Sequence, residues 1–119
     1  MSLTHKIEKH PSGVVVFSLE GKIIITNEFE PISSGLEQQL NQTKRKFLVD
    51  ISNVTHINSS GLNLLLRMFT KVRNKGGELV IVSPSASVEK LLSISKLDSI
   101  FTICADQTEA LKNLNAQEA

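Results

Sequence analysis

The segment from Phe47 to Leu62 is the part of this chain that most constrains its fold. It begins with Phe-Leu-Val-Asp-Ile, an apolar run of strand length, and ends with Asn-Ser-Ser-Gly-Leu, which opens a series of leucines at helical spacing. A strand, a short polar connection and a helix in this order predict a β-α unit. The two serines then lie at a helix N-terminus, where free backbone N–H groups and the helix dipole stabilise an anion.

Two more strands are predicted further along the chain, at residues 78–82 and 100–104, and each precedes a helical pattern. The helix of the first unit is expected to run from Ser60 to Lys75 and to end at Gly76-Gly77, because glycine accepts the positive φ of a helix terminus. Its buried face should consist of Leu62, Leu65, Leu66, Phe69 and Val72.

Capping residues predict where the last two helices begin. Ser83 should be an N-cap with Pro84 at the first helical position, and Asp106 and Glu109 have the spacing of a capping box. The inner face of the earlier helix should be Val88, Leu91 and Leu92, and that of the last helix Ala110, Leu111 and Leu114.

The beginning of the chain predicts a β-hairpin. Residues 6–10 and 14–19 are candidate strands, and Pro11-Ser12-Gly13 between them is a turn sequence. Gly21 is expected to end the second strand, and residues 22–26 should connect it to a helix.

That helix should start between Asn27 and Pro31, where Asn27 and Glu30 have the spacing of a capping pair. Phe29, Ile32, Leu36 and Leu40 share one helical face.

Strands that alternate with helices imply parallel strands joined by right-handed crossovers, and the hairpin adds an antiparallel strand. We therefore expect an α/β fold with a mixed sheet, in which an N-terminal hairpin precedes the β-α units and the helices pack mainly on one face. The 119 residues should form one domain, residues 1–119, which buries about two-thirds of its unfolded surface.

Composition argues against several classes of function. The net charge is +1 and neither Trp nor Tyr is present, so we expect no nucleic-acid binding. No apolar run of about 18 residues is present, so we expect no membrane insertion. The single Cys104 cannot form an internal disulfide, and no Cys/His spacing indicates zinc. We expect neither a metal nor another cofactor.

The segment 47–62 closely resembles the signature of the STAS domain, the fold of bacterial anti-sigma-factor antagonists. In that family a strand ending in Asp precedes a loop and an Asp-Ser-Ser/Thr/Ala-Gly-Leu run. The first serine of that run is phosphorylated by the partner anti-sigma factor, a serine kinase. Asp50 matches the strand end and Ser59 the acceptor. Two strands, a helix and three β-α units is also the STAS order, so the resemblance covers nearly the full chain.

The resemblance implies a partner-binding surface around Ser59. Gly61 lacks a Cβ, and we expect this to let a large partner approach the backbone. Asn58 and Ile24 stand where family members usually carry acids. The implied surface consists of Gly21, Ile24, Asn27, Asn58, Ser60, Gly61, Leu62, Asn63 and Arg67.

The resemblance also implies a regulatory function in place of an enzymatic one. Unphosphorylated, such a protein binds an anti-sigma serine kinase in the cytoplasm and thereby frees a sigma factor. Phosphate on Ser59 would weaken that binding by charge repulsion and desolvation. A phosphatase of the PP2C type would reset the switch.

Three alternatives remain open. One serine could simply be the helix N-cap. Ser59, His56 and Asp50 are the residue types of a hydrolase triad, although Ile57 occupies the position of the first glycine of a nucleophile elbow. The third alternative is a non-phosphorylated STAS scaffold, such as a subunit of a lipid-transport ABC complex or a stressosome-like module. The absence of acids at positions 24 and 58 favours this scaffold.

Overall fold

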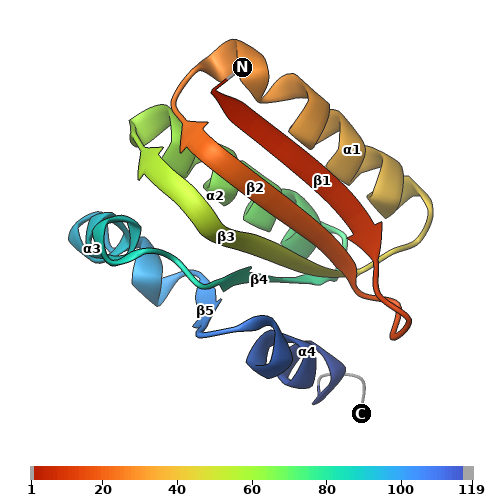
Figure 1. Ribbon diagram of the computed structural model, residues 1–119. Coiled ribbons are helices and arrows are strands. Elements are labelled where there is room, and N and C mark those ends of the chain that lie inside the picture. The colour runs from red at the N-terminus through yellow and green to blue at the C-terminus, as the bar shows by residue number, and fades with distance from the viewer. Residues whose placement is uncertain (1, 117–119) are drawn as a thin grey trace.

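The computed structural model describes residues 2–116, which form a five-stranded sheet with helices packed on it (Figure 1). The elements in chain order are β1 (Leu3–Lys9), β2 (Val15–Ile23), the 3₁₀ helix η1 (Thr26–Glu28), α1 (Glu30–Asn41), β3 (Lys46–Ile57), α2 (Ser59–Asn74), β4 (Glu78–Val82), α3 (Ala86–Ile94), the 3₁₀ helix η2 (Leu97–Ser99), β5 (Thr102–Cys104) and α4 (Gln107–Ala116).

The strands lie side by side in sequence order. β1 is antiparallel to β2, whereas β2, β3, β4 and β5 are parallel to one another. The predicted hairpin turn is present: Gly13 has a φ of +94°, and the N–H of His10 donates to the carbonyl oxygen of Val14 at 2.8 Å. The predicted mixed α/β sheet is confirmed, although β1 begins at Leu3 and not at Lys6.

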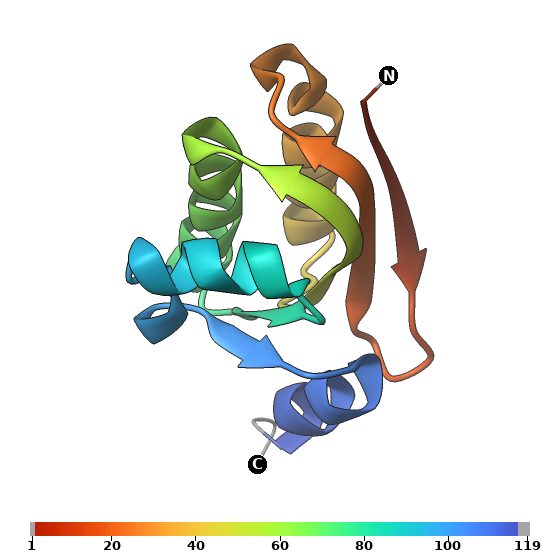
Figure 2. The ribbon, with the colours of Figure 1, turned by 60° about the vertical axis from the view of Figure 1, so that its left-hand side comes forward.

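Both faces of the central strands are apolar, because successive side chains of a strand point to opposite faces. In β3, Phe47 and Val49 point into a large core beneath α1, α2 and α3, and Leu48 points into a smaller core beneath α4. Figure 2 shows α4 apart from the other three helices. The expectation that the helices pack mainly on one face is therefore confirmed. The smaller core contains Val14, Val16, Leu48, Val80, Val82, Cys104, Ala110 and Leu114.

The buried face of α2 differs from the predicted one. Leu65 and Val72 are buried as expected, but Leu64 and Met68 are buried as well. Phe69 is only half-buried; its ring centroid lies 5.4 Å from that of Phe101, which follows η2. α2 lies between α1 and α3, so its apolar surface is wider than a single stripe, and its flanks contact neighbouring segments. Leu62 and Leu66 are likewise half-buried.

Strands β2 and β3 are both longer than predicted. Gly21 does not end β2: it adopts a φ of +101° within the strand, at a register shift before Lys22. Likewise, the predicted loop after Ile51 continues as strand to Ile57. The pairing of β2 with β3 extends to Ile23 and Ile57. Its hydrogen bonds hold residues 52–57 in a strand, although these residues lack the alternation of apolar and polar side chains that is typical of one.

The predicted start of α3 is wrong by two residues. Ser85 is the N-cap, and its hydroxyl oxygen accepts from the N–H of Val88 at 3.3 Å. Ser83 has a φ of +56° and donates its hydroxyl hydrogen to the carbonyl oxygen of Ala105, so it belongs to the connection. Pro84 therefore precedes the helix.

The other predicted caps have different outcomes. The N–H of Glu109 donates to Asp106 Oδ1 at 2.8 Å, and Glu109 Oε2 accepts from Ala105, so a cap of the predicted kind begins α4. The predicted pair of Asn27 and Glu30 is absent, because η1 precedes α1 and no side chain caps that helix.

Leu91, which was predicted on the inner face of α3, is exposed. The last strand, predicted to begin at Ile100, begins at Thr102, and Ile100 is exposed. The four apolar residues assigned to α1 and its start are all buried: Phe29, Ile32, Leu36 and Leu40.

Candidate functional site

The predicted acceptor lies where four elements meet: the ends of β2 and β3, the start of α2, and η1. β2 and β3 extend beyond β4, whose pairing with β3 stops at Asp50. The N-terminus of α2 therefore projects from the end of this two-stranded extension. The first residue of α2 is Ser59, whose side chain is exposed.

Asn58 is the N-cap of α2. Its side-chain oxygen accepts from the N–H of Gly61 at 3.0 Å, and its side-chain nitrogen donates to the carbonyl oxygen of Ile24 at 3.4 Å. The alternative in which a serine caps the helix is therefore wrong. Among residues 2–116, neither Ser59 nor Ser60 uses its hydroxyl in a hydrogen bond.

Gly61 is buried, which contradicts the expectation that it leaves room for a partner. A Cβ at this position would overlap the carbonyl oxygen of Ile23 and would lie 2.6 Å from Cγ1 of Ile57. The glycine is required because α2 packs directly on the ends of β2 and β3. Leu62 is half-buried and packs against the large core. Gly61 and Leu62 therefore lie beneath the predicted partner-binding surface and are not exposed on it.

A hollow of about 300 Å³ lies beside the start of α2. Its lining brings Ser60, Asn63 and Arg67 of α2 together with Thr26 and Phe29 from around η1. Three of the predicted surface residues therefore share one concave site. Thr26 and Phe29 were not part of the predicted surface. The prediction placed Thr26 in a connection and Phe29 on the apolar face of a helix.

The other side of η1 presents an apolar surface. Ile25 is 47% exposed, and with Asn27, Glu28 and Pro31 it lines a second shallow hollow. The predicted residue Asn27 therefore lines a different hollow from Ser60. A signal for Ile25 was present in the sequence, because three consecutive isoleucines cannot all point to one face of a strand.

The predicted residue Gly21 lies further back along β2, where it pairs with Val54 and contacts the N-terminal end of β1. A Cβ there would overlap the carbonyl oxygen of Ser2, and that oxygen accepts from the N–H of Lys22 at 2.8 Å. Gly21 thus lets β1 approach β2 closely. The structure does not bring it together with Ser59.

η1 is held in place by the start of β1. The backbone N–H of Ser2 donates to Glu28 Oε2 at 2.9 Å, and the hydroxyl of Ser2 donates to Oε1. The hydroxyl hydrogen bond is the main reason that the pKa of Glu28 is lowered. The only acid on η1 is therefore already bonded, and the surface near Ser59 has no free carboxylate from this element.

The proposed hydrolase residues are not arranged as a triad. Asp50 Oδ2 accepts from Gln107 at 2.7 Å and Oδ1 from the N–H of Ser52 at 2.9 Å. Partial burial works to raise the pKa of Asp50, but these hydrogen bonds outweigh it and the net pKa is lowered. The His56 ring contacts the Thr55 hydroxyl instead of a carboxylate. Neither relay contact of a triad is present.

Metal sites and membrane-spanning helices are both absent from the described part of the chain. Within residues 2–116, no three His, Cys, Asp or Glu side chains are grouped to hold a metal ion. In the same part of the chain, no helix has the length and apolar character needed to cross a bilayer.

The fold is a mixed five-stranded sheet with its strands in sequence order, and α2 follows its central strand. The family model described as "STAS domain" matches residues 6–110. This chain therefore belongs to the STAS domain family, and several of its relatives are named as anti-sigma factor antagonists. A Thermotoga neapolitana protein is 33% identical over 68% of this chain and 72% of its own length, and its name describes it as a candidate anti-sigma factor antagonist, a homologue of TM1081.

Solved structures share the fold. An anti-sigma factor antagonist from Mycobacterium paratuberculosis has a TM-score of 0.82 at 22% identity, with 96% of this chain and 95% of that chain covered. SpoIIAA of Bacillus, in its phosphorylated form, has a TM-score of 0.72 at 19% identity, with 92% and 98% covered. At these identities the comparison establishes the architecture alone.

Proposed function

We propose that this protein is an anti-sigma-factor antagonist that binds an anti-sigma serine kinase in the cytoplasm and so frees a sigma factor. The observation that carries the proposal is the state of Ser59. It is exposed at the first position of α2, and within residues 2–116 its hydroxyl makes no hydrogen bond, because Asn58 provides the helix cap. The family relationship supplies the class of partner.

Ser59, and not Ser60, is the proposed phosphorylation site. Ser60 is half-buried and faces the hollow with Arg67, whereas Ser59 is exposed to an approaching kinase. A phosphate on Ser59 would lie at the N-terminus of a 16-residue helix, where the dipole and unpaired N–H groups favour an anion. The phosphorylated protein should therefore remain folded.

The phosphate acts on the complex more than on the fold. It would add a charge of about −1.5 to −2 within the interface and weaken binding by repulsion and desolvation. A coupling of about 1–3 kcal/mol corresponds to about 5–150-fold in affinity, which is enough for a switch. A PP2C-type phosphatase would return the protein to its binding form.

The test is to incubate the wild type, Ser59→Ala and Ser60→Ala with purified anti-sigma kinases from the same genome and ATP. Phosphate is then located by peptide mass spectrometry. We expect label on the wild type and on Ser60→Ala but not on Ser59→Ala. Label on Ser59→Ala but not on Ser60→Ala would assign the phosphate to Ser60 instead.

A non-phosphorylated STAS scaffold is the second candidate. The observation that favours it is the uncharged surface at Ile24 and Asn58, whose contact with each other involves only an amide and a carbonyl group. If no anti-sigma kinase labels or binds the wild type, the scaffold function replaces the first proposal.

A further inference from the structure

The hollow beside Ser60 has an unusual chemical lining. Four of its five residues (Thr26, Ser60, Asn63 and Arg67) carry side chains that can donate hydrogen bonds, and none of the five is acidic. The fifth is Phe29, which is buried and belongs to the large core. The hollow therefore combines one apolar residue with four hydrogen-bond donors, one of which is positively charged.

These donors are not used within the protein. Among residues 2–116, the side chains of Thr26, Ser60, Asn63 and Arg67 take part in no hydrogen bond or ion pair. Their neighbours differ, since Asn58 is bonded to Gly61 and Ile24. Unused donors that line one concave surface can bind an acceptor supplied from outside.

Arg67 also differs from the other arginines of the chain. Arg45 donates to the carbonyl oxygens of Leu40 and Lys44, and Arg73 is paired with Glu78. Arg67 is exposed and has no such partner among the described residues. A guanidinium group binds a carboxylate through two parallel hydrogen bonds, which makes it the residue best suited to an acidic side chain.

We propose that this hollow receives an aspartate or glutamate side chain of the protein that docks over Ser59. This inference rests on the proposed function and specifies the chemistry of the partner. One positive charge in the hollow balances one carboxylate, whereas a phosphate dianion would retain excess negative charge. Positions 24 and 58 add no carboxylate that could compete for Arg67, and the Glu28 carboxylate is bonded to Ser2.

The site also explains how phosphorylation of Ser59 would weaken partner binding. Ser59 is adjacent to Ser60, which lines the hollow, so a phosphate on Ser59 would lie beside the incoming carboxylate. Like charges on neighbouring positions repel each other. The partner's acidic side chain is thus the group that senses the phosphate.

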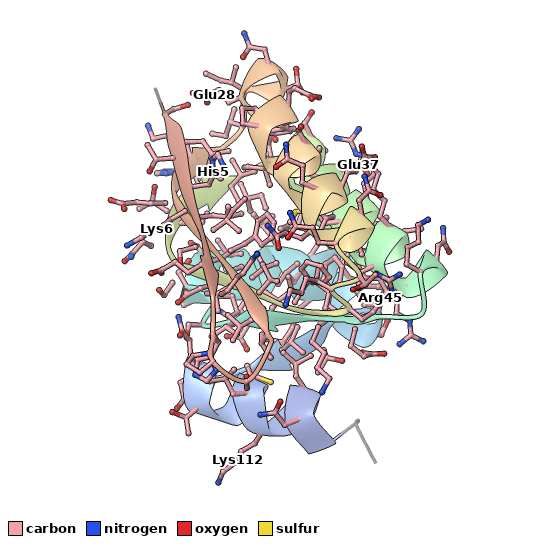
Figure 3. All side chains as sticks on the ribbon, turned by 90° about the vertical axis from the view of Figure 1, so that its right-hand side faces the viewer. His5, Lys6, Glu28, Glu37, Arg45 and Lys112 are labelled. Carbon is pink, nitrogen blue, oxygen red and sulfur yellow. The ribbon has the colours of Figure 1, made fainter. Side chains whose placement is uncertain are left out.

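The test measures binding of a purified anti-sigma kinase from the same genome by calorimetry. Arg67→Gln should weaken binding about 10-fold to 100-fold, the range expected for loss of charge-assisted hydrogen bonds. The affinity of Arg67→Lys should lie between those of the wild type and Arg67→Gln, because lysine keeps the positive charge but cannot form two parallel hydrogen bonds to a carboxylate. The matched control is Lys112→Gln on α4, which also removes one exposed positive charge; Figure 3 shows Lys112 at the opposite end of the molecule from Glu28.

Salt dependence provides a readout that a merely structural effect would not change. Binding of the wild type should weaken when the salt is raised from about 50 to about 300 mM, and Arg67→Gln should lose part of that dependence. Circular-dichroism melts should be alike for all variants, since Arg67 and Lys112 are exposed. Replacing the partner's acidic residue by a basic one should weaken kinase binding to the wild type and partly restore kinase binding to an Arg67→Glu variant.

The outcomes separate the two proposals. If the kinase binds the wild type and Arg67→Gln equally well, the carboxylate site is wrong while the antagonist function stands. If inorganic phosphate occupies the hollow in NMR titrations and leaves kinase binding unchanged, the site belongs to a small anion and the inference is overturned. If no anti-sigma kinase binds the wild type, the proposed function fails and this inference fails with it.

Discussion

Gly61 at the start of α2 packs directly against the carbonyl group of Ile23 at the end of β2. A Cβ at position 61 would overlap the Ile23 oxygen and would lie 3.0 Å from Cγ2 of the same residue. This contact joins the helix that carries Ser59 to the strand that leads into η1. The two sides of the candidate site are therefore placed relative to each other by backbone packing.

Gly61→Ala should destabilise the protein although alanine favours helices. The added methyl group has no space, and overpacking of this kind costs about 1–3 kcal/mol. Urea denaturation measures the loss. Asn63→Ala, at an exposed position two residues further along α2, is the control and should change stability by no more than about 0.5 kcal/mol. A Gly61→Ala protein as stable as the wild type would refute the close contact.

Asn58 should be replaceable by aspartate but not by alanine. Asn58→Ala removes the cap that accepts from Gly61 and should lower the free energy of unfolding by about 1 kcal/mol. Asn58→Asp keeps the acceptor for Gly61 and adds a negative charge at the helix N-terminus, which is worth about 0.3–1 kcal/mol, but it loses the hydrogen bond donated to Ile24. Its stability at neutral pH should therefore be close to that of the wild type and above that of Asn58→Ala. Chemical denaturation of the three proteins tests this order, and equal stability of Asn58→Ala and wild type would contradict it.

Asp50 should contribute stability that depends on pH. Its pKa in the folded protein lies below the ordinary value of 3.8 because Ser52 and Gln107 donate to the carboxylate. A lowered folded pKa means that the stabilisation is present above the unfolded pKa and is lost as the pH falls through the folded value.

Asp50→Asn should accordingly be less stable than the wild type at about pH 7, and the difference should shrink toward about pH 2. Gln107→Ala should show a smaller effect in the same direction, since the bond from Ser52 remains. Urea unfolding across this pH range is the measurement. A difference between Asp50→Asn and wild type that is independent of pH would exclude a role for the ionised carboxylate.

Ser59→Asp should imitate phosphorylation only in part. One carboxylate has less charge and fewer acceptor oxygens than a phosphate, so partner binding should fall less than in the phosphorylated wild type. Neither change should lower the melting temperature, because the N-terminus of α2 favours negative charge. Calorimetric binding and thermal melts of the three forms check both statements, and a large loss of stability on phosphorylation would contradict the second.

The sequence by itself determined the order of the elements and placed the proposed acceptor, Ser59, at a helix start. The apolar run after Lys46 and the leucine spacing after Gly61 are local patterns, and local patterns set strand and helix identity. The β-α order then predicted a mixed sheet with parallel strands, which the structure confirms. Ser59 could be placed at a helix start because Asn58, Gly61 and the leucines that follow mark that boundary within a few residues.

Only the tertiary structure decided what surrounds the acceptor. Residues 52–57 lack strand alternation, and they are extended because β2 pairs with them as far as Ile57. The burial of Gly61 depends on Ile23, which is 38 positions earlier in the sequence, and the hollow depends on Thr26 lying beside Arg67. Such contacts join residues far apart in the chain, so no local pattern encodes them. They arise only when the sheet brings the end of β2 to the start of α2.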